Sequence, residues 1–231
     1  SKVFLDFDGV MQRPTIFVNG AFAGEWKYGY ASFRIDATPH LRVGTNKIHV
    51  HVANPPRSTR WYPGAGIYRN VWIERTPLVH IAYNGVYAHT TSVDNKIAVV
   101  KIETTLDNDR NQKAERVVRT TIGKKSASKL VTIEPHQSTT VTQELRVMKP
   151  NLWTLDDPYL YVVKTEVINS QDTVLDSKKT KIGLRSIAWK KDGFYLNGKR
   201  VPLNGVFMKY EKYDDVVIFA SGDPLFYGFA A

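Results

Sequence analysis

Apolar and polar residues alternate along almost the whole chain with a period of two, and helix signals are nearly absent. Ten such runs are rich in Val, Ile, Thr and aromatic residues and are bounded by Gly, Asn, Asp or Pro, which is typical of short β-strands. They are residues 3–10, 15–20, 47–52, 70–75, 96–106, 115–122, 129–134, 139–147, 159–168 and 172–183. The pattern predicts an all-β protein built of packed sandwiches, with the run Val71, Trp72, Ile73 as part of a buried strand.

Turn signals group these strands. Asn19-Gly20 lies between two apolar runs and predicts a tight hairpin, and Thr76-Pro77 is the expected seam between a first and a second sandwich. A smaller unit follows, with turns predicted at Asp192-Gly193 and Asn197-Gly198. The predicted domains are residues 1–76, residues 77–186, a hairpin unit over residues 187–206, and a tail over residues 207–231.

Composition narrows the function classes. The 231 residues include no cysteine, which excludes disulfides and thiolate metal sites. No apolar run reaches the roughly 18 residues of a membrane helix, so no membrane partner is expected. A net charge of +10 would suggest nucleic acid, but the basic residues are spread along the chain and flank turns, as solubilising charges do. We therefore expect no nucleic-acid partner.

The stretch RSTRWYPGAGIYRNVWIER, residues 57–75, is the first candidate binding element. Its glycines allow positive φ and its proline stiffens the backbone, so the loop is expected to hold a shape. Loops on a rigid scaffold often carry binding residues. The alternative is that Trp61 and Tyr62 close the end of a sandwich core.

Two further patterns are open to more than one interpretation. Trp26, Tyr28 and Tyr30 alternate, so they would share one face of an extended segment, where they either stack on sugar rings or bases or cover a core. His49 and His51 share a face with Lys47. A His-x-His pair can bind zinc, but no third ligand is near in the sequence, and we interpret this face as solvated, with no metal.

No catalytic residue is predicted. Acid–base catalysis by carboxylates needs two of them converging on one bond, one protonated and one not, and no segment presents such a pair. Asp156-Asp157 precedes a proline and is typical of a turn, while Asp6 and Asp8 lie on the polar face of a predicted strand. The G-x-S-x-G pattern of a nucleophile elbow is also missing.

A series of motifs in register resembles the front part of glycoside hydrolase family 2, the family of β-galactosidases, β-mannosidases and β-glucuronidases. FLDFDGV, FVNGAFAGEWKYGY and RWYPGAGIYRNVWI resemble its N-terminal sugar-binding-type jelly-roll domain. NLWTLDDPYLY and KIGLRSIAW are similar to the end of its immunoglobulin-like sandwich, where an LWSP-type motif and a GxR motif recur. GFYLNGKRVPLNGV resembles the hairpin that leads into its catalytic barrel. The resemblance covers about residues 3–206.

The resemblance implies a function for the parent enzyme. Family members are retaining exo-glycosidases whose acid/base and nucleophile are two glutamates, about 5 Å apart, on a TIM barrel. The acid/base glutamate usually follows an asparagine, and no Asn-Glu dipeptide occurs here. We therefore expect a non-catalytic portion of a β-galactosidase-like enzyme, without a cofactor, that supports the barrel and rims its pocket. The expected rim residues are Asn54, Arg60, Trp61 and Tyr62.

The expected partners follow from the same resemblance. They are the catalytic barrel of the parent enzyme and, weakly, carbohydrate. The alternative is a stand-alone carbohydrate-binding module that uses Trp26, Tyr28 and Tyr30 as its stacking platform. The compartment is unknown; a bacterial-type protein with a periplasmic or secreted parent is the expectation.

Both ends depart from the family pattern. VVIFASGDPLFYG resembles the S-adenosylmethionine-binding motif of tetrapyrrole (precorrin) methyltransferases, in which Gly222 would approach the cofactor, Asp223 would help to bind it and Pro224 would stiffen the turn. We interpret the tail as foreign or frameshifted, with chance similarity as the alternative. The family's strands before FLDFDGV are absent, so an open apolar edge and self-association are expected.

Overall fold

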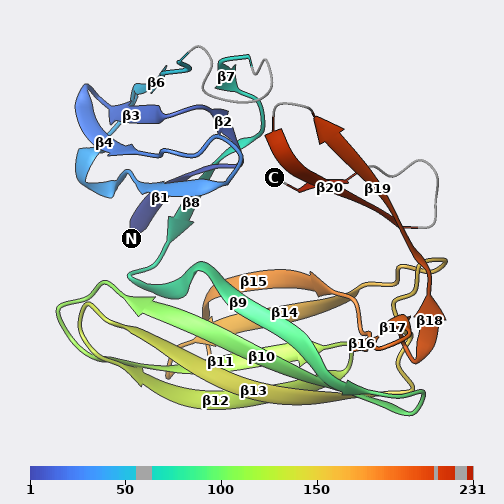
Figure 1. Cartoon of the computed structure of the whole chain (residues 1–231). Coiled ribbons are helices and arrows are strands. Elements are labelled where there is room, and N and C mark those ends of the chain that lie inside the picture. Colours follow the sequence, from blue (N-terminus) through green and yellow to red (C-terminus); the bar gives the residue numbers. More distant parts are fainter. Residues whose placement is uncertain (56–63, 211–212, 222–227, 231) are drawn as a thin grey trace.

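The computed structural model describes residues 1–55, 64–210, 213–221 and 228–230, with side chains up to Leu203. Nearly all regular structure is β-strand, which confirms the all-β prediction, and the described residues include a single short 3-10 helix, η1 (Thr38–His40). Figure 1 shows two layered bodies of strands joined end to end, with a third group of strands at the C-terminal end. None of the described helical segments is long and apolar enough to cross a membrane.

The first sandwich packs two antiparallel sheets, with strand orders β5-β1-β8 and β4-β3-β6. Its strands are β1 (Lys2–Phe7), β2 (Val10–Met11), β3 (Pro14–Val18), β4 (Ala21–Glu25), β5 (Phe33–Asp36), β6 (Ile48–Val52), β7 (Gly66–Ile67) and β8 (Val71–Thr76). Phe7 and Phe33 stack in the core with ring centroids 4.8 Å apart, and Ile16 and Val18 pack in the same cluster. The two sheets enclose one apolar core because alternate residues of β1, β3 and β5 point inward.

The predicted hairpin at Asn19-Gly20 is confirmed between β3 and β4. Both residues have positive φ, 53° and 85°. A two-residue hairpin turn needs these values because its backbone must follow the twist of the two paired strands. The Asn19 side chain also donates to His40 O at 2.9 Å. This side-chain bond ties the turn to the connection that follows η1.

The prediction of a buried strand at residues 70–75 is wrong. β8 is present, but Val71, Trp72 and Ile73 are 42%, 57% and 70% exposed. Among the described strands β8 pairs only with β1, so it forms an edge of its sheet. An apolar run marks a strand, but only the neighbouring strands decide whether its faces are covered.

The second sandwich packs the sheet β13-β10-β9 on the sheet β12-β11-β14-β15. Its strands are β9 (Val79–Val93), β10 (Ile97–Asn108), β11 (Ala114–Ile122), β12 (Lys125–Ile133), β13 (Ser138–Met148), β14 (Tyr161–Ile168) and β15 (Val174–Ile182). Two clusters of buried side chains fill the space between the sheets, one around Ile81 and Leu106 and the other around Ile102 and Leu184. Strict alternation of buried and half-buried residues along β10 follows the period seen in the sequence.

The remaining strands form two small antiparallel sheets. β16 (Ile187–Lys190), β17 (Gly193–Leu196) and β18 (Lys199–Val201) make the predicted hairpin unit, with a turn at each predicted position. β19 (Leu203–Tyr210), β20 (Tyr213–Ser221) and β21 (Gly228–Ala230) pair in that order. Gly222, Asp223 and Pro224 lie outside the described residues. The domain limits stay predictions, although β8 ends at Thr76 and β9 begins at Val79, on either side of the expected seam.

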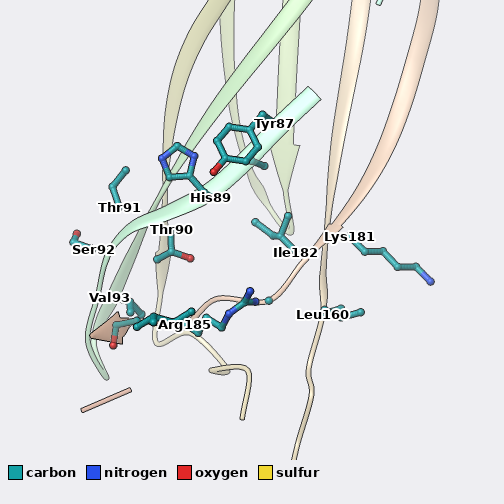
Figure 2. A pocket seen from close by; sticks show the side chains of 14 residues that line it. Tyr87, His89, Thr90, Thr91, Ser92, Val93, Leu160, Lys181, Ile182 and Arg185 are labelled. Carbon is teal, nitrogen blue, oxygen red and sulfur yellow. The ribbon is translucent and has the colours of Figure 1, made fainter. Parts of the chain in front are cut away.

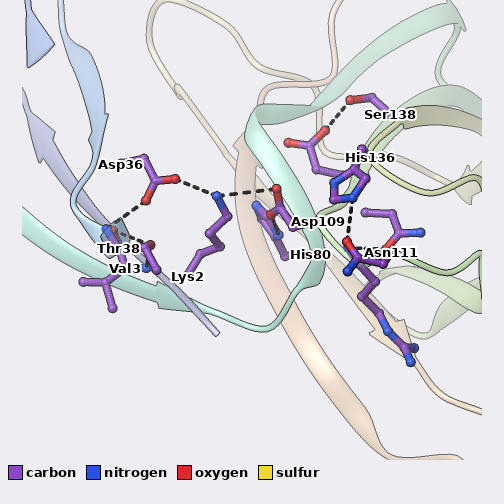
Figure 3. Close-up of polar contacts among 12 residues, drawn as sticks. Lys2, Val3, Asp36, Thr38, His80, Asp109, Asn111, His136 and Ser138 are labelled. Atoms are coloured by element: carbon purple, nitrogen blue, oxygen red, sulfur yellow. Dashed lines mark hydrogen bonds and ion pairs between the residues drawn. The ribbon is translucent and has the colours of Figure 1, made fainter. Parts of the chain in front are cut away.

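Ion pairs join the two sandwiches. Arg34 on β5 makes a bidentate contact with Asp6 on β1 and also binds Glu74 on β8, which in turn binds Lys178 on β15. A second group is shown in Figure 3, where Lys2 Nζ lies 2.6 Å from Asp36 and 3.6 Å from Asp109 of the second sandwich. Together these contacts fix the first sandwich against β15 and against Asp109, which directly follows β10.

The carboxyl groups of this junction are held in their ionised form. Burial alone would raise the pKa of Glu74, but hydrogen bonds and charges from Lys178 and Arg34 outweigh it and lower the pKa below its ordinary 4.5. Burial likewise opposes ionisation of Asp36, while hydrogen bonds from Lys2 and Thr38 lower its pKa below 3.8. Both carboxylates therefore stabilise the folded state only while they remain charged.

Acid should weaken this junction. A carboxyl group with a lowered pKa stabilises the fold above its unfolded pKa, and the contribution is lost as pH falls through the lower folded value. We expect the urea midpoint of unfolding to be steady from about pH 7 down to about pH 5 and to fall below about pH 4.5. Glu74→Gln should be less stable at neutral pH and should lose less stability on acidification. Parallel profiles for the two proteins would contradict a role for Glu74.

Candidate functional site at the end of the first sandwich

Three connections of the first sandwich meet at one end of it. The chain leaves β6 at Val52 and returns at β7, which pairs with β2 through Val10↔Ile67 and Met11↔Gly66. This pairing brings the two ends of the predicted binding loop beside the residues that follow β2. The loop is thus attached to the sandwich on both sides, as a shaped binding loop requires.

Hydrogen bonds tie the same end together. Gln12 donates from Nε2 to Asn54 Oδ1 at 3.5 Å, and the Tyr68 hydroxyl donates to Gly29 O at 2.8 Å. Gly29 in turn lies so close to β2 that a Cβ would meet Met11 Sδ at 2.7 Å. The backbone at Gly29 can approach only because it carries no side chain.

Asn54 is the one predicted rim residue that the structure describes. It lies at this end, in contact with Gln12, immediately before the segment that carries the other three. Arg60, Trp61 and Tyr62 lie outside the described residues. Their role as rim residues stays a prediction.

The three aromatic residues of the predicted stacking platform do not share one environment in the structure. Residues 26–32 do not continue β4 as a strand. The Trp26 ring stacks on buried Phe33, with centroids 5.7 Å apart and an interplanar angle of 13°, so one of its faces covers the core. Tyr28 and Tyr30 remain 60% and 51% exposed and contact each other edge to face at 5.7 Å. The core-covering interpretation therefore describes Trp26, whereas the two tyrosines are free to meet a ligand.

His49 and His51 are exposed on β6, in agreement with a solvated face. Val50 and Val52 pack against the first core on the other side of the strand. His49 contacts the Phe17 ring at 6.4 Å between centroids. Within the described ranges no group of three or more His, Asp or Glu side chains is placed to share a metal ion.

Two carboxylates that share one cation, Asp6 and Glu74, are not suited to glycoside hydrolysis. Asp6 and Glu74 both bind Arg34, at the junction of the sandwiches. A glycosidase acid needs a raised pKa so that it holds a proton, whereas the pKa of Glu74 is lowered. Asp8 accepts a hydrogen bond from Trp72 Nε1 at 3.0 Å. These groups serve structure.

The LW and GxR motifs meet at the far end of the second sandwich. A Cβ on Gly183 would lie 2.7 Å from two atoms of the Trp153 ring, so the tryptophan packs directly on this glycine. The Arg185 guanidinium lies 5.2 Å over the same ring. Asn197 of the hairpin turn donates from Nδ2 to Trp153 O at 2.9 Å and accepts from Ser186 N at 3.0 Å. Two motifs distant in the sequence thus form one contact that anchors the hairpin unit.

Sequence reasoning missed several residues of these sites. Gln12, Gly29 and Tyr68 carry no local signal of a shared role, since their contacts join positions 39 and 42 residues apart. Arg34 and Glu74 likewise look like ordinary polar-face residues. Arg34 belongs to β5, a strand that the sequence did not predict, and no local pattern places Arg34 beside Glu74.

Comparison with known proteins agrees with the resemblance seen in the sequence. Residues 79–185 match the family model described as glycosyl hydrolases family 2. The chain is 37% identical over 220 residues to the beta-galactosidase BoGH2A of Bacteroides ovatus. The match covers 91% of this chain and 26% of that protein.

Solved structures give the same result. A glycosyl hydrolase family 2 member from Bacteroides cellulosilyticus superposes with a TM-score of 0.81 at 33% identity, covering 86% of this chain and 28% of that one. The beta-glucuronidase of Bacteroides uniformis superposes with a TM-score of 0.77 at 29% identity, covering 86% and 26%. The chain spans about a quarter of the length of these relatives.

Residues 79–185 thus match glycosyl hydrolases family 2, and the likeness of the whole chain to these longer relatives is consistent with a non-catalytic N-terminal portion of such an enzyme. The family model and these relatives give no support to a methyltransferase motif in the tail.

Proposed function

We propose that this chain serves a retaining, β-galactosidase-like glycosidase that removes terminal β-linked sugars. In this proposal the two sandwiches brace the catalytic barrel, and the end formed by Gln12, Asn54 and Tyr68 contributes to the rim of its pocket. The observation that carries the proposal is the likeness to a beta-galactosidase along 91% of the chain. The contact of Asn54 with Gln12, beside the loop that holds Arg60, Trp61 and Tyr62, supports the position of the rim.

Bracing requires that the two sandwiches keep a fixed orientation. The junction supports this, because Arg34 is 11% exposed, binds two carboxylates and lies between the rings of Phe4 and Tyr83 at 4.5 and 4.4 Å. Hydrogen-bonded ion pairs of this kind restrict geometry more than a flexible linker would. The exposed side chains of β8 are in keeping with a further partner at that edge, either the barrel or a second copy.

The alternative function is a stand-alone carbohydrate-binding module. It is favoured by the exposed pair Tyr28 and Tyr30, which could stack on a sugar ring. It predicts that sugar binding depends on Tyr28, whereas the rim proposal predicts dependence on Asn54.

The purified chain is expected to release no nitrophenol from nitrophenyl β-galactoside, β-glucuronide or β-mannoside above the buffer rate. An incomplete pocket should bind galactose with a Kd of about 1 mM or weaker, near −4 kcal/mol. In NMR titrations the shifts should concentrate at Gln12, Asn54 and Tyr68, and Asn54→Ala should weaken them several-fold.

The matched control is Asn95→Ala, which changes an exposed asparagine in the turn before β10. Turnover by the chain itself would contradict the non-catalytic assignment. Galactose shifts that are lost in Tyr28→Ala and kept in Asn54→Ala would replace the rim proposal with the binding module.

A further inference from the structure

A groove lies at one end of the second sandwich, between the last part of β9 and the segment that follows β15 (Figure 2). Its volume is about 610 Å³, within the range of roughly 300–1,000 Å³ that small-molecule sites occupy. Its walls come from residues 87–93, Leu160, residues 181–183 and residues 185–187. It shares no described residue with the end of the first sandwich that contains Asn54, so the two sites can be tested separately.

A positioned cation lies at one wall of this groove. Arg185 is exposed, and its guanidinium is held over the Trp153 ring at 5.2 Å. In the part of the chain that the structure describes, Arg185 forms no ion pair with a carboxylate. Lys181, at the rim, likewise has no acidic partner among those residues. An arginine that is fixed by stacking and lacks an acid partner is suited to bind an anion through its planar donors.

An aromatic surface forms the opposite wall. Tyr87 is 59% exposed and His89 stacks against it, with ring centroids 4.8 Å apart at 29°. Both belong to β9, two positions apart, so they project to one side of the strand, as Figure 2 shows. Because His89 supports one face of the tyrosine, the ring is held in place for contact with a flat apolar surface.

Hydroxyl groups complete the lining. The register between β9 and β10 shifts at Thr91, because Ser92 pairs with Val99 and Thr90 with Val100, which leaves Thr91 as an extra residue. Such bulges re-aim the side chains around them. Thr91 Oγ1 donates to Val99 O at 3.3 Å, while Thr90 and Ser92 line the groove. The groove therefore combines hydroxyls, an aromatic ring and a cation.

We propose that this groove binds an anionic saccharide, such as a sugar bearing a uronic acid group. Arg185 would bind the carboxylate, Thr90 and Ser92 would exchange hydrogen bonds with sugar hydroxyls, and Tyr87 would contact the C–H face of the ring. A carbohydrate combines an apolar ring face with a dense set of hydroxyls. An acidic sugar adds a carboxylate that can pair with Arg185. The proposal does not depend on the parent enzyme's activity.

The test is an NMR titration of the full 231-residue chain with glucuronate, glucose and acetate at the same ionic strength. Glucuronate should shift the amide signals of residues 87–93 and 181–187, with an affinity about tenfold higher than that of glucose or acetate. Arg185→Gln should weaken glucuronate about tenfold and leave glucose nearly unchanged. Tyr87→Ala should weaken both sugars and leave acetate unchanged.

Arg146→Gln is the matched control, because it removes one exposed positive charge from β13, outside the groove. Tyr87→Ala changes an exposed side chain, so the test stands even if Arg185→Gln disturbs Trp153. Equal binding of acetate and glucuronate would reduce the groove to a simple anion site and overturn the proposal. Glucuronate affinity that is the same in Arg185→Gln, Tyr87→Ala and the control would overturn it too. Shifts confined to Gln12, Asn54 and Tyr68 would leave the rim proposal standing and reject this one.

Discussion

Replacing Gly183 with alanine is expected to lower the free energy of unfolding by about 2 kcal/mol, the middle of the range for overpacked positions. The added Cβ would lie 2.7 to 2.8 Å from three side-chain atoms of Trp153. The tryptophan cannot move away freely, because Trp153 N donates to Leu184 O at 2.9 Å and its carbonyl accepts from Asn197. The melting temperature should fall by about 4–8 °C for a chain of this size.

A second substitution tests whether the loss of stability in Gly183→Ala comes from the contact with Trp153 or from a general effect on the end of β15. In a Trp153→Ala background the ring is absent, so Gly183→Ala should cost clearly less than in the parent chain. Gly64→Ala is the matched control, since its Cβ would meet no atom of the described residues within 4 Å and the change should be nearly neutral. Equal costs of Gly183→Ala in both backgrounds would show that Trp153 is not the cause.

Arg34→Met is expected to destabilise the chain by about 3 kcal/mol, at the lower end of the range for breaking a buried ion pair because Asp6 and Glu74 keep some exposure. The substitution leaves the Asp6 carboxylate, 16% exposed, without its bidentate partner. It also removes the cation from between the Phe4 and Tyr83 rings. Urea unfolding at neutral pH measures the loss.

The same variant has a characteristic pH dependence. Without Arg34 the Glu74 carboxylate loses one of the two cations that lower its pKa. The difference in unfolding free energy between Arg34→Met and the parent chain should therefore shrink as pH falls below about 4.5. Arg146→Gln, which removes an exposed arginine, should change stability by less than about 0.5 kcal/mol at every pH. A cost of Arg34→Met that does not vary with pH would assign the loss to packing alone.

Local pattern predicted the strands well where their environment was conventional. Alternation located β10, β13 and β15, and the Asn-Gly pairs marked turns whose positive φ values only those residues adopt easily. The short strand β5 was missed because four residues are too few to show a period. β8 was found, but its burial was wrong, since an apolar run does not reveal whether another strand covers it.

The candidate sites depended more on tertiary structure. Trp26 looked equivalent to Tyr28 and Tyr30 by spacing, but the chain turns after β4 and lays its ring on Phe33. Asn54 was chosen from its family motif, whereas its neighbour Gln12 had no signal of its own, 42 residues earlier. The groove beside Arg185 was not predicted either, because it forms between β9 and residues almost a hundred positions later.

The sequence by itself determined the all-β class, the Asn-Gly turns and the resemblance to family 2, because each depends on local periodicity or on short motifs. Only the tertiary structure decided which strands form edges, which carboxylates share Arg34, and how Trp153, Gly183 and Arg185 meet. Those features arise where residues distant in the chain are brought together by sheet pairing. Their energies depend on burial and on the distance between the partners, neither of which a local pattern contains.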